Sequence, residues 1–549
     1  MRNKPFLVLS LLIICVTILG FPLDMMPPDA ALYGSIAKEM HLNNDFINLY
    51  SLGEDWLDKP HLPFWLTAIS FKIFGVSNFA YKLPGVLIFF LGVWATYKFT
   101  KKSYNKETAL IAAIILATSL HSVISNFDVR AEPYLTGFIM ASLYWFYKYI
   151  QQKRWQDLLV ASLFCAFAIM TKGIFAMIPL VAALGGHFII TKQWKEILNP
   201  MWLVALVFII IFIIPELYTL YVQFDMHPEK IVFGKTEVSG IKFFLWDSQF
   251  GRFFNTGPIK GHGDPFFFVH TILWAFLPWS ILFYIATFLK VKRNIKIVNK
   301  NEEFYTLFGT LATVLVFSLS KFQLAHYTNI VFPFMAIITA DFIVKLKNKY
   351  QHLVKTYTIT QYFLITISVL AIIALSIVMK PEFNYWILLI LLLCGSAIYL
   401  VFKTKQEKIK RILYLSAISF CFLYGFMLSH FYPTLFKYQG GVHAAKYINK
   451  NDFKDINLLK NNSYNFGFEF YCNKPINRIS IEDLSNSQNK MNMNFFATKK
   501  DLTLFSEKNI SFSIIKEFDY YRITKLKGKF LSPKTREKTL SKKYLIKLN

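Results

Sequence analysis

The sequence predicts a polytopic α-helical membrane protein that ends in a small soluble α/β domain. Hydrophobic residues make up 55% of the 549-residue chain, and its mean hydropathy is +0.40. Many apolar runs approach about 20 residues, the length that a helix needs to cross a hydrocarbon core of about 30 Å. After residue 430 the apolar runs shorten and Asn and Lys become frequent, which indicates a domain outside the bilayer.

The first apolar run, residues 6–23, follows Arg2 and Lys4. No small-x-small cleavage site follows it, so we expect a retained membrane helix and not a cleaved signal peptide. Further apolar runs lie at residues 79–98, 107–125, 133–150, 156–171, 173–190, 199–220, 266–289, 303–320, 327–344, 357–379, 384–402 and 411–430. Together they predict about thirteen membrane spans. An odd number of spans places the two ends of the chain on opposite sides of the membrane.

Lysine and arginine are concentrated in every second connection between these runs. The basic connections contain Lys101, Lys102, Lys106, Lys153, Arg154, Lys192, Lys195, Lys292, Arg293, Lys296, Lys300, Lys345, Lys347, Lys349, Lys403, Lys405, Lys408, Lys410 and Arg411. By the positive-inside rule these connections are cytoplasmic, so we expect a cytoplasmic N-terminus and a C-terminal domain on the opposite side. The formal net charge of +27 therefore reports membrane orientation, and we expect no nucleic-acid partner.

Two outer connections, residues 24–78 and 221–264, are too long to be simple turns, and long ordered loops are often functional. We expect amphipathic helices in them at Ala30–Met40, Pro63–Phe74 and Ile241–Phe254. Residues 1–430 are thus assigned to a membrane domain that includes both loops.

Residues 431–549 are assigned to the α/β domain, whose surplus of basic residues suits a surface that faces anionic lipid headgroups. Within it, strands are expected at Tyr464–Tyr471, Ser511–Phe518 and Tyr520–Leu526, and helices at Val442–Asn449 and Lys500–Lys508.

Four ionisable residues lie at the ends of apolar runs, all on the outer side in this topology: Asp29, Glu132, Lys172 and Lys321. Charged groups are costly at a membrane boundary and often mark a functional site. Each also has a structural explanation. The carboxylates are favoured at helix N-termini, and the long lysine side chains can extend from the ends of the spans to the lipid headgroups. His61 is expected at the membrane interface.

These residues belong to short motifs that follow one another along the chain: Asp29–Tyr33, Asp58–Pro60, Glu132–Pro133, Thr171–Gly173, Pro278–Trp279 and Lys321–Tyr327. The set resembles the lipid-carrier-dependent glycosyltransferases of the C-type membrane fold (GT-C), particularly the aminoarabinose transferase branch, which is related to the protein O-mannosyltransferases. The resemblance covers roughly residues 5–345 and keeps the family's motif order. Ala30 and Leu32 depart from the pattern, because the family has Glu and Arg at these positions.

The resemblance implies an inverting transfer of a sugar from a polyprenyl (undecaprenyl) phosphate to an acceptor on the periplasmic side of a bacterial inner membrane. Asp29 is the candidate base, since a carboxylate within reach of the acceptor hydroxyl can take its proton. Glu132 is expected to act in catalysis or sugar binding. Cations stabilise the charge that develops on a leaving phosphate, and the candidates for this role are Lys59, Arg252, Lys172 and Lys321, with Tyr327 as a hydrogen-bond donor. Further candidates for substrate binding are Tyr33, Arg130, His262 and His326.

Arg130 or Arg252 is a candidate to replace the cation that the family has at Leu32. We expect no metal site, because His262 and Asp264 alone are too few ligands, and no cofactor.

The expected partners are the lipid-linked donor, membrane lipids, and an acceptor that is a lipid A-like glycolipid, a protein or a polysaccharide. A polysaccharide ligase or polymerase that uses a lipid diphosphate is one alternative. A transporter is the other, although no internal repeat is evident and the charges lie at span ends, away from the bilayer midplane.

Overall fold

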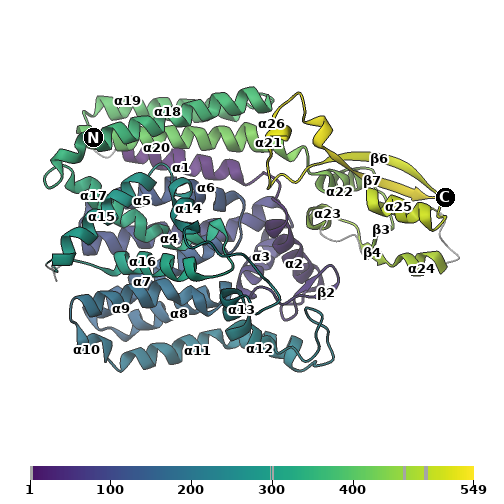
Figure 1. Ribbon diagram of the computed structural model, residues 1–549, viewed down its shortest axis with the longest axis horizontal. Helices are drawn as coiled ribbons and strands as arrows, with labels where there is room; N and C mark the ends of the chain where they lie inside the picture. Colours follow the sequence, from purple (N-terminus) through teal and green to yellow (C-terminus); the bar gives the residue numbers. More distant parts are fainter. Residues whose placement is uncertain (1–3, 297, 299–301, 461–464, 487–491) are drawn as a thin grey trace. The chain divides into compact units, whose positions relative to one another are not determined.

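The computed structural model describes residues 4–296, 298, 302–460, 465–486 and 492–549 (Figure 1). The chain divides into two compact units. The first contains Met1–Phe21, Met40–Val369 and Leu388–Gly425, and the second contains Pro22–Glu39, Leu370–Ile387 and Phe426–Asn549. Tyr464, the first residue of one expected strand, lies outside the described residues.

The first unit is almost entirely helical. Its α-helices are α1 (Lys4–Gly20), α3 (Leu62–Phe74), α4 (Asn78–Ser103), α5 (Lys106–Thr118), α6 (Leu120–Phe127), α7 (Ala131–Gln152), α8 (Trp155–Lys172), α9 (Ile178–Ile190), α10 (Trp194–Ile197), α11 (Met201–Leu220), α12 (Gly240–Lys242), α13 (Ser248–Phe254), α14 (Phe267–Ala275), α15 (Ser280–Lys296), α16 (Tyr305–Leu319) and α17 (Phe332–Lys345). Shorter 3-10 or π-helical turns are η1 (Ile174–Met177), η2 (Tyr221–Asp225), η3 (Phe243–Asp247), η4 (Ala325–Val331) and η5 (Gln351–Leu353), and β1 (Tyr50–Ser51) pairs with β2 (Glu54–Asp55). Four helices have residues in both units: α2 (Asp29–Asn43), α18 (Val354–Met379), α19 (Trp386–Lys403) and α20 (Lys408–Phe426).

Every expected apolar run coincides with a helix or a broken helix. Among the described residues, seven helices are long and apolar enough to cross a membrane, or eight if α5 and α6 form one span bent by 55°. Shorter apolar helices lie at Lys4–Gly20, Leu62–Phe74, Ile174–Ile190 and Tyr305–Leu319. The run at 266–289 is broken into α14 and α15, with Pro278 between them. The protein is therefore a polytopic helical membrane protein.

Small residues allow the central helices of the first unit to approach closely. Helix α7 packs between α4 and α8. A Cβ atom at Gly137 on α7 would lie 2.1 Å from the carbonyl oxygen of Ile88 on α4, and one at Gly92 would lie 2.9 Å from the Cα of Gly137. Glycine at a helix crossing is typical of membrane proteins, where packing replaces the hydrophobic effect as the driving force. This crossing holds the N-terminus of α7, and therefore Glu132, in place.

The second unit contains a five-stranded sheet with the order β4-β3-β5-β7-β6. The strands are β3 (Ile456–Leu459), β4 (Ile476–Ile479), β5 (Asn494–Thr498), β6 (Phe512–Tyr520) and β7 (Ser541–Leu548), and the helices are α21 (Tyr432–Phe436), α22 (Gly440–Lys450), α23 (Phe466–Tyr471), α24 (Ile481–Asn486), α25 (Lys499–Glu507) and α26 (Gly528–Leu531), with η6 (Met427–Phe431) and η7 (Glu537–Thr539). Strand β3 pairs in parallel with β4 and β5, whereas β7 is antiparallel to β5 and β6.

Alternating side chains of the sheet form two apolar layers. Phe496 faces α22 and α23, where it stacks on Phe468 with ring centroids 4.2 Å apart. The neighbouring Phe495 faces the opposite way and packs against Phe505 of α25. The predicted helices near α22 and α25 and the predicted strand near β6 are confirmed. The predicted strands at Tyr464–Tyr471 and Tyr520–Leu526 are wrong, because Phe466–Tyr471 is helix α23 and β6 ends at Tyr520.

Charged residues of α2 hold α23 in the second unit. The Lys38 ammonium donates to the carbonyl oxygens of Glu469, Phe470 and Cys472, at 3.2, 2.9 and 2.5 Å. Glu469 is also ion-paired with Arg478 of β4. Burial raises the pKa of Glu469 to about 7, although Arg478 acts in the opposite direction, and burial also raises the pKa of Glu39. Glu469 therefore titrates near neutral pH.

Candidate active site

A partly buried carboxylate lies between two cations in the first unit. Asp58 precedes α3 and forms ion pairs with Lys59 and with Arg252, which is on α13. Their side chains are only 23%, 16% and 14% exposed, respectively. Burial favours the neutral acid, but Lys59 and Arg252 outweigh it, so the pKa of Asp58 lies below its ordinary value. Burial lowers the pKa of Lys59, and the nearby charges of Arg252 and Lys172 act in the same direction. The group thus carries one more positive than negative charge.

A second ion pair joins the facing ends of α7 and α8. Lys172, the last residue of α8, donates to Oε1 of Glu132 in the first turn of α7 at 2.7 Å. Both charges suit the dipole of the helix end on which they lie. The Lys172 ammonium also lies 3.7 Å from the centre of the Tyr327 ring, a cation–π contact. Nε2 of His326 is 3.7 Å from the same Glu132 oxygen.

Gln249 on α13 fixes the end of α8. Its side-chain amide donates to the carbonyl oxygen of Lys172 at 3.0 Å. Gly173 ends α8 with φ +95, a conformation that favours glycine. A Cβ atom at Gly173 would lie 2.3 Å from the Gln249 amide nitrogen. Gln249 and Arg252 are three residues apart, so one face of α13 reaches both ion pairs.

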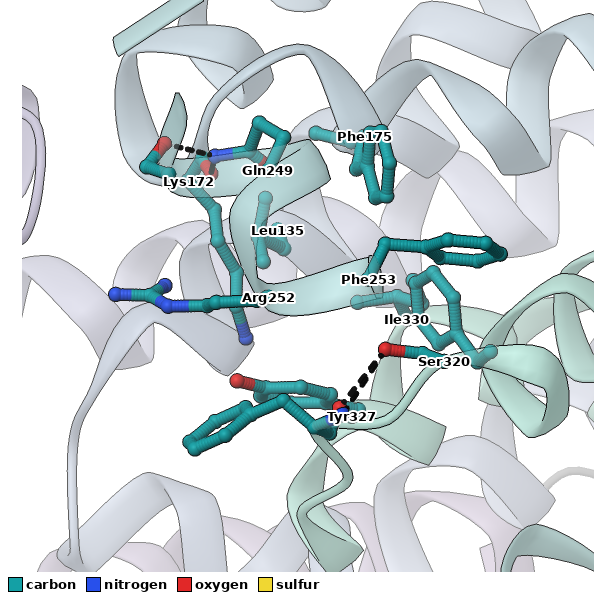
Figure 2. Close-up of a pocket in the computed structure, with 13 residues that line it drawn as sticks. Leu135, Lys172, Phe175, Gln249, Arg252, Phe253, Ser320, Tyr327 and Ile330 are labelled. Atoms are coloured by element: carbon teal, nitrogen blue, oxygen red, sulfur yellow. Dashed lines mark hydrogen bonds between the residues drawn. The ribbon is translucent and has the colours of Figure 1, made fainter. Parts of the chain in front are cut away.

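A cavity of about 70 Å³ opens between these groups (Figure 2). Lys172, Arg252, Gln249 and Tyr327 line its polar part, and the remaining walls are mainly apolar, formed by Leu135, Phe175, Ala176, Phe253, Phe317, Phe322 and Ile330 together with Ser248 and Ser320. Figure 2 shows the Lys172 side chain extending from α8 towards the Tyr327 ring. A site with cations on one side and aromatic and aliphatic walls on the other matches a ligand with an anionic head and an apolar tail.

Arg130 and Lys321, two further residues expected in the site, do not line the cavity but lie close along the chain to residues of the site. Arg130 forms an ion pair with the buried Asp128 at 2.9 Å, two residues before Glu132. Lys321 is exposed, between the lining residues Ser320 and Phe322, and its amide donates to the carbonyl oxygen of Phe253.

His262 is exposed in a loop that lies against this segment. A Cβ atom at the flanking Gly261 or Gly263 would lie within 2.7 Å of the Lys321 or Ser320 carbonyl oxygen. The two glycines therefore permit the loop to touch the 320–322 segment.

Asp29 and Tyr33 lie on the part of α2 that belongs to the second unit. Asp29 is the first residue of the helix and is partly exposed, as is Tyr33 in the following turn. The expected helix at Ala30–Met40 is confirmed. The assignment of Asp29 as the base stays a prediction.

Several polar residues in and around the site were not predicted from the sequence as functional. Asp58 was identified only as part of a motif, and Asp128 and Gln249 were not singled out. His61 was expected at the membrane interface, but this is wrong, because His61 is fully buried within the protein. Its backbone N–H and its Nδ1 lie 2.9 and 3.0 Å from the Glu216 carboxylate. Glu216 lies inside the apolar run 199–220, and an acidic residue in such a run indicates that a polar residue elsewhere in the protein pairs with it.

No three His, Cys, Asp or Glu side chains come together to hold a metal ion within the part of the chain that the structure describes. The charged groups of the site favour the binding of an anion, because the two that line the cavity, Lys172 and Arg252, are both cations. Together with Lys59 they exceed by one charge the carboxylates Asp58 and Glu132 with which they pair. The Tyr327 hydroxyl adds a hydrogen-bonding group.

Comparisons with known proteins agree with this chemistry. A sequence profile described as dolichyl-phosphate-mannose-protein mannosyltransferase matches residues 58–218. The chain is 30% identical over 406 residues to an uncharacterized protein of Aquifex aeolicus (strain VF5), which covers 72% of this chain and 73% of that protein. It is 27% identical over 393 residues to undecaprenyl phosphate-alpha-4-amino-4-deoxy-L-arabinose arabinosyl transferase 2 of Proteus mirabilis (strain HI4320), over 67% of this chain and 66%, just under two thirds, of that protein.

The whole fold is similar to that of ArnT from Cupriavidus metallidurans, solved with bound undecaprenyl phosphate. The TM-score is 0.75 at 13% identity, over 99% of this chain and 97% of ArnT. The fold and the site define a membrane-embedded glycosyltransferase of the GT-C class. The chain belongs to the superfamily of the aminoarabinose transferases and the protein mannosyltransferases.

Proposed function

We propose that this glycosyltransferase moves a sugar from a polyprenyl (undecaprenyl) phosphate to a lipid A-like glycolipid or another envelope acceptor on the periplasmic face of a bacterial inner membrane. The observation that carries the proposal is the cavity in which Lys172 and Arg252 meet apolar walls. The names of the relatives, and the undecaprenyl phosphate bound to the similar ArnT structure, support the same donor.

The reaction is a single displacement that inverts the anomeric carbon. The acceptor hydroxyl oxygen attacks this carbon, and the bond to the phosphate oxygen breaks with its electron pair leaving on the phosphate. Asp29 takes the proton of the acceptor hydroxyl. Lys59, Arg252 and Lys172 stabilise the charge that develops on the phosphate, and they do so in a partly buried site where their effect is larger than in water.

The neighbouring residues position these groups or bind the substrates. Glu132 is bonded to Lys172, so we assign it to holding that ammonium and, with His326, to the sugar side of the site. Tyr327 contacts Lys172 and donates to the phosphate or the sugar. Lys321, exposed beside two lining residues, meets the phosphate from outside.

Arg130, His262 and Tyr33 remain candidates for contacts with the sugar or the acceptor. Arg252, which is paired with Asp58, is our candidate to replace the arginine that the family has at the position of Leu32.

The proposed arrangement in the membrane follows the charge pattern. All thirteen helical runs cross the bilayer, with the N-terminus in the cytoplasm. Residues 1–430 form the transferase domain with periplasmic loops at 24–78 and 221–264, and residues 431–549 form a periplasmic α/β domain.

The donor site is tested by binding of undecaprenyl phosphate to the purified full-length protein, measured by native mass spectrometry. Arg252→Gln removes a cation that lines the cavity and is expected to weaken binding by tenfold or more, since a charged hydrogen bond contributes about 1.5–3 kcal/mol. Lys260→Gln, in the same outer loop but exposed, is the matched control and leaves binding unchanged. Equal binding by Arg252→Gln and the unaltered protein contradicts the donor site.

The acceptor is tested by mass spectrometry of the envelope from a strain that lacks this protein. We expect a sugar to be lost from lipid A and to return when the gene is restored, but not with Asp29→Asn. The profile match to protein mannosyltransferases supports a second candidate, an O-glycosyltransferase that acts on proteins. Loss of the sugar from secreted proteins, with unchanged lipid A, favours that candidate. Normal turnover by purified Asp29→Asn contradicts its role as the base.

A further inference from the structure

The connection between β6 and β7 is strongly basic. Residues 522–538, here named the basic strap, contain one acid, Glu537, and the cations Arg522, Lys525, Lys527, Lys529, Lys534, Arg536 and Lys538. All five lysines are exposed, and none forms an ion pair with any residue that the structure describes. The strap therefore presents a row of unneutralised charges to its surroundings.

The strap is ordered, because aromatic stacking and one inward-facing arginine anchor it. Phe530 stacks on Tyr521 with ring centroids 3.9 Å apart and contacts the Tyr438 ring at 5.1 Å. The Arg536 guanidinium donates to the carbonyl oxygens of Phe530 and Leu531, at 3.0 and 3.1 Å. The exposed lysines thus project from a fixed backbone, so little backbone entropy is lost on binding.

Arg536 also ties the strap to the end of a membrane-crossing helix. Its guanidinium donates to the Val378 carbonyl oxygen at 2.8 Å, one residue before α18 ends. Helix α18 belongs to the candidate span Gln351–Met379. In Figure 1, α26 of the strap lies beside this end of α18.

Aromatic residues mark the same end of α18 as a membrane interface. Phe383, Tyr385 and Trp386 follow the helix and are 64%, 78% and 57% exposed. Exposed Tyr and Trp at the end of a span are typical of the headgroup level of a bilayer. The Arg536 bond holds the strap within a few residues of this aromatic group, and therefore near the headgroups.

We propose that the basic strap binds the phosphate groups of anionic bilayer lipids. The charge, the exposure and the tether at the headgroup level all fit this partner, and the interaction is independent of the glycosyl transfer. Each lysine near an anionic membrane surface strengthens binding by about fivefold. Because the lysines are exposed, salt screens the attraction over a Debye length of about 8 Å at physiological ionic strength.

The test uses the full-length protein in detergent, titrated with phosphatidylglycerol and followed by native mass spectrometry. The strap variant is Lys525→Gln, Lys527→Gln and Lys529→Gln, which keeps Phe530 and Arg536. The matched control is Lys499→Gln, Lys500→Gln and Lys508→Gln, three exposed lysines on or next to α25 in the same unit. Both variants change the net charge equally, and an unchanged melting temperature shows that each is folded.

We expect the strap variant to bind phosphatidylglycerol at least about tenfold more weakly, and the control to bind like the unaltered protein. Phosphatidylcholine should bind weakly to all three proteins. Raising the salt from about 0.05 to 0.5 M should weaken phosphatidylglycerol binding by the unaltered protein. Unchanged binding by the strap variant, equal loss in the control, equal binding of phosphatidylcholine or insensitivity to salt each overturns the proposal.

Discussion

Replacing Glu132 with Gln separates the structural role of the Glu132–Lys172 pair from its role in transfer. The glutamine keeps the size of the side chain and still accepts a hydrogen bond, but it leaves the Lys172 ammonium without its neutralising charge. Glu132 is 3% exposed and Lys172 is 19% exposed. Breaking a buried pair costs about 3–5 kcal/mol, and the partial exposure of Lys172 favours the lower end, about 3 kcal/mol.

We expect Glu132→Gln to lower the melting temperature of the purified protein and to reduce turnover of a polyprenyl-phosphate sugar by about a hundredfold. The loss of turnover follows because Lys172 no longer has a fixed position, and small displacements of a catalytic group cost about that much. Turnover is measured below the melting temperature of the variant, so that unfolding does not contribute.

The double variant Glu132→Gln with Lys172→Met is the decisive control. Replacing a buried ion pair by neutral groups of similar volume is often neutral for stability, so the melting temperature should return close to that of the unaltered protein. Turnover should stay low, because the cation over Tyr327 is gone. The reasoning is refuted if Glu132→Gln turns over within about threefold of the unaltered protein, or if the double variant regains activity.

Three further changes test the surroundings of the site and the second unit. Gly173→Ala should reduce turnover at least about tenfold, because φ +95 disfavours alanine and its Cβ would displace Gln249; Gly185→Ala on α9, where a Cβ meets nothing within 4 Å, should keep full activity. Glu216→Gln should lower the free energy of unfolding by about 1.5–3 kcal/mol, read as a lower melting temperature, because the His61 backbone N–H loses a charged acceptor. Glu229→Gln, 70% exposed, should change it by less than about 0.5 kcal/mol; equal melting temperatures would argue against a stabilising His61–Glu216 pair. The pKa of Glu469 is raised to about 7, so the folded state binds the extra proton, and this contribution to stability is complete below about pH 4.5 and is lost as pH rises through 7. Hydrogen exchange of α23 in the full-length protein, corrected for intrinsic rates, should show stability falling by up to ~3 kcal/mol across that interval; Glu469→Gln should remove this slope, and an identical slope in the variant would contradict the titration.

The helices of the first unit could be predicted because their signal is local. Each apolar run needs only its own composition to indicate a lipid-facing or buried helix, and the runs coincide with helices. The breaks were harder. Helix α5 bends into α6 at Ser119, within a run that reads as continuous, because the bend depends on what packs beside it.

The pairing within the site could not be predicted, because it joins distant parts of the chain. Asp58 and Arg252 are 194 residues apart, and nothing near either residue indicates the other. The motif order suggested that Lys172 and Glu132 act in one site, and the structure pairs them directly. Gln249 carries no charge and belongs to none of the motifs, so its bond to the Lys172 carbonyl had no sequence signal.

The sheet of the second unit shows the limits of pattern reading for short strands. Strand β3 is four residues, all buried, and lacks the alternation that identifies a half-exposed strand. The aromatic residues of Phe466–Tyr471 favour a strand by composition, but they form helix α23 because Phe468 stacks on Phe496 and Lys38 caps the helix end. Tertiary contacts outweigh local preference in this segment.

The short helix α13 has a consequence for how this protein can vary. Gln249 holds the end of α8 and Arg252 holds Asp58, and both depend on a spacing of three residues on one helical face. Inserting or deleting a single residue between them would rotate one relative to the other by about 100° and separate the two contacts. Single substitutions along this helix can leave the spacing intact, but an insertion or deletion within it cannot. The two contacts are therefore inherited together, and natural variation in loop length should fall on either side of Gln249–Arg252, never within it.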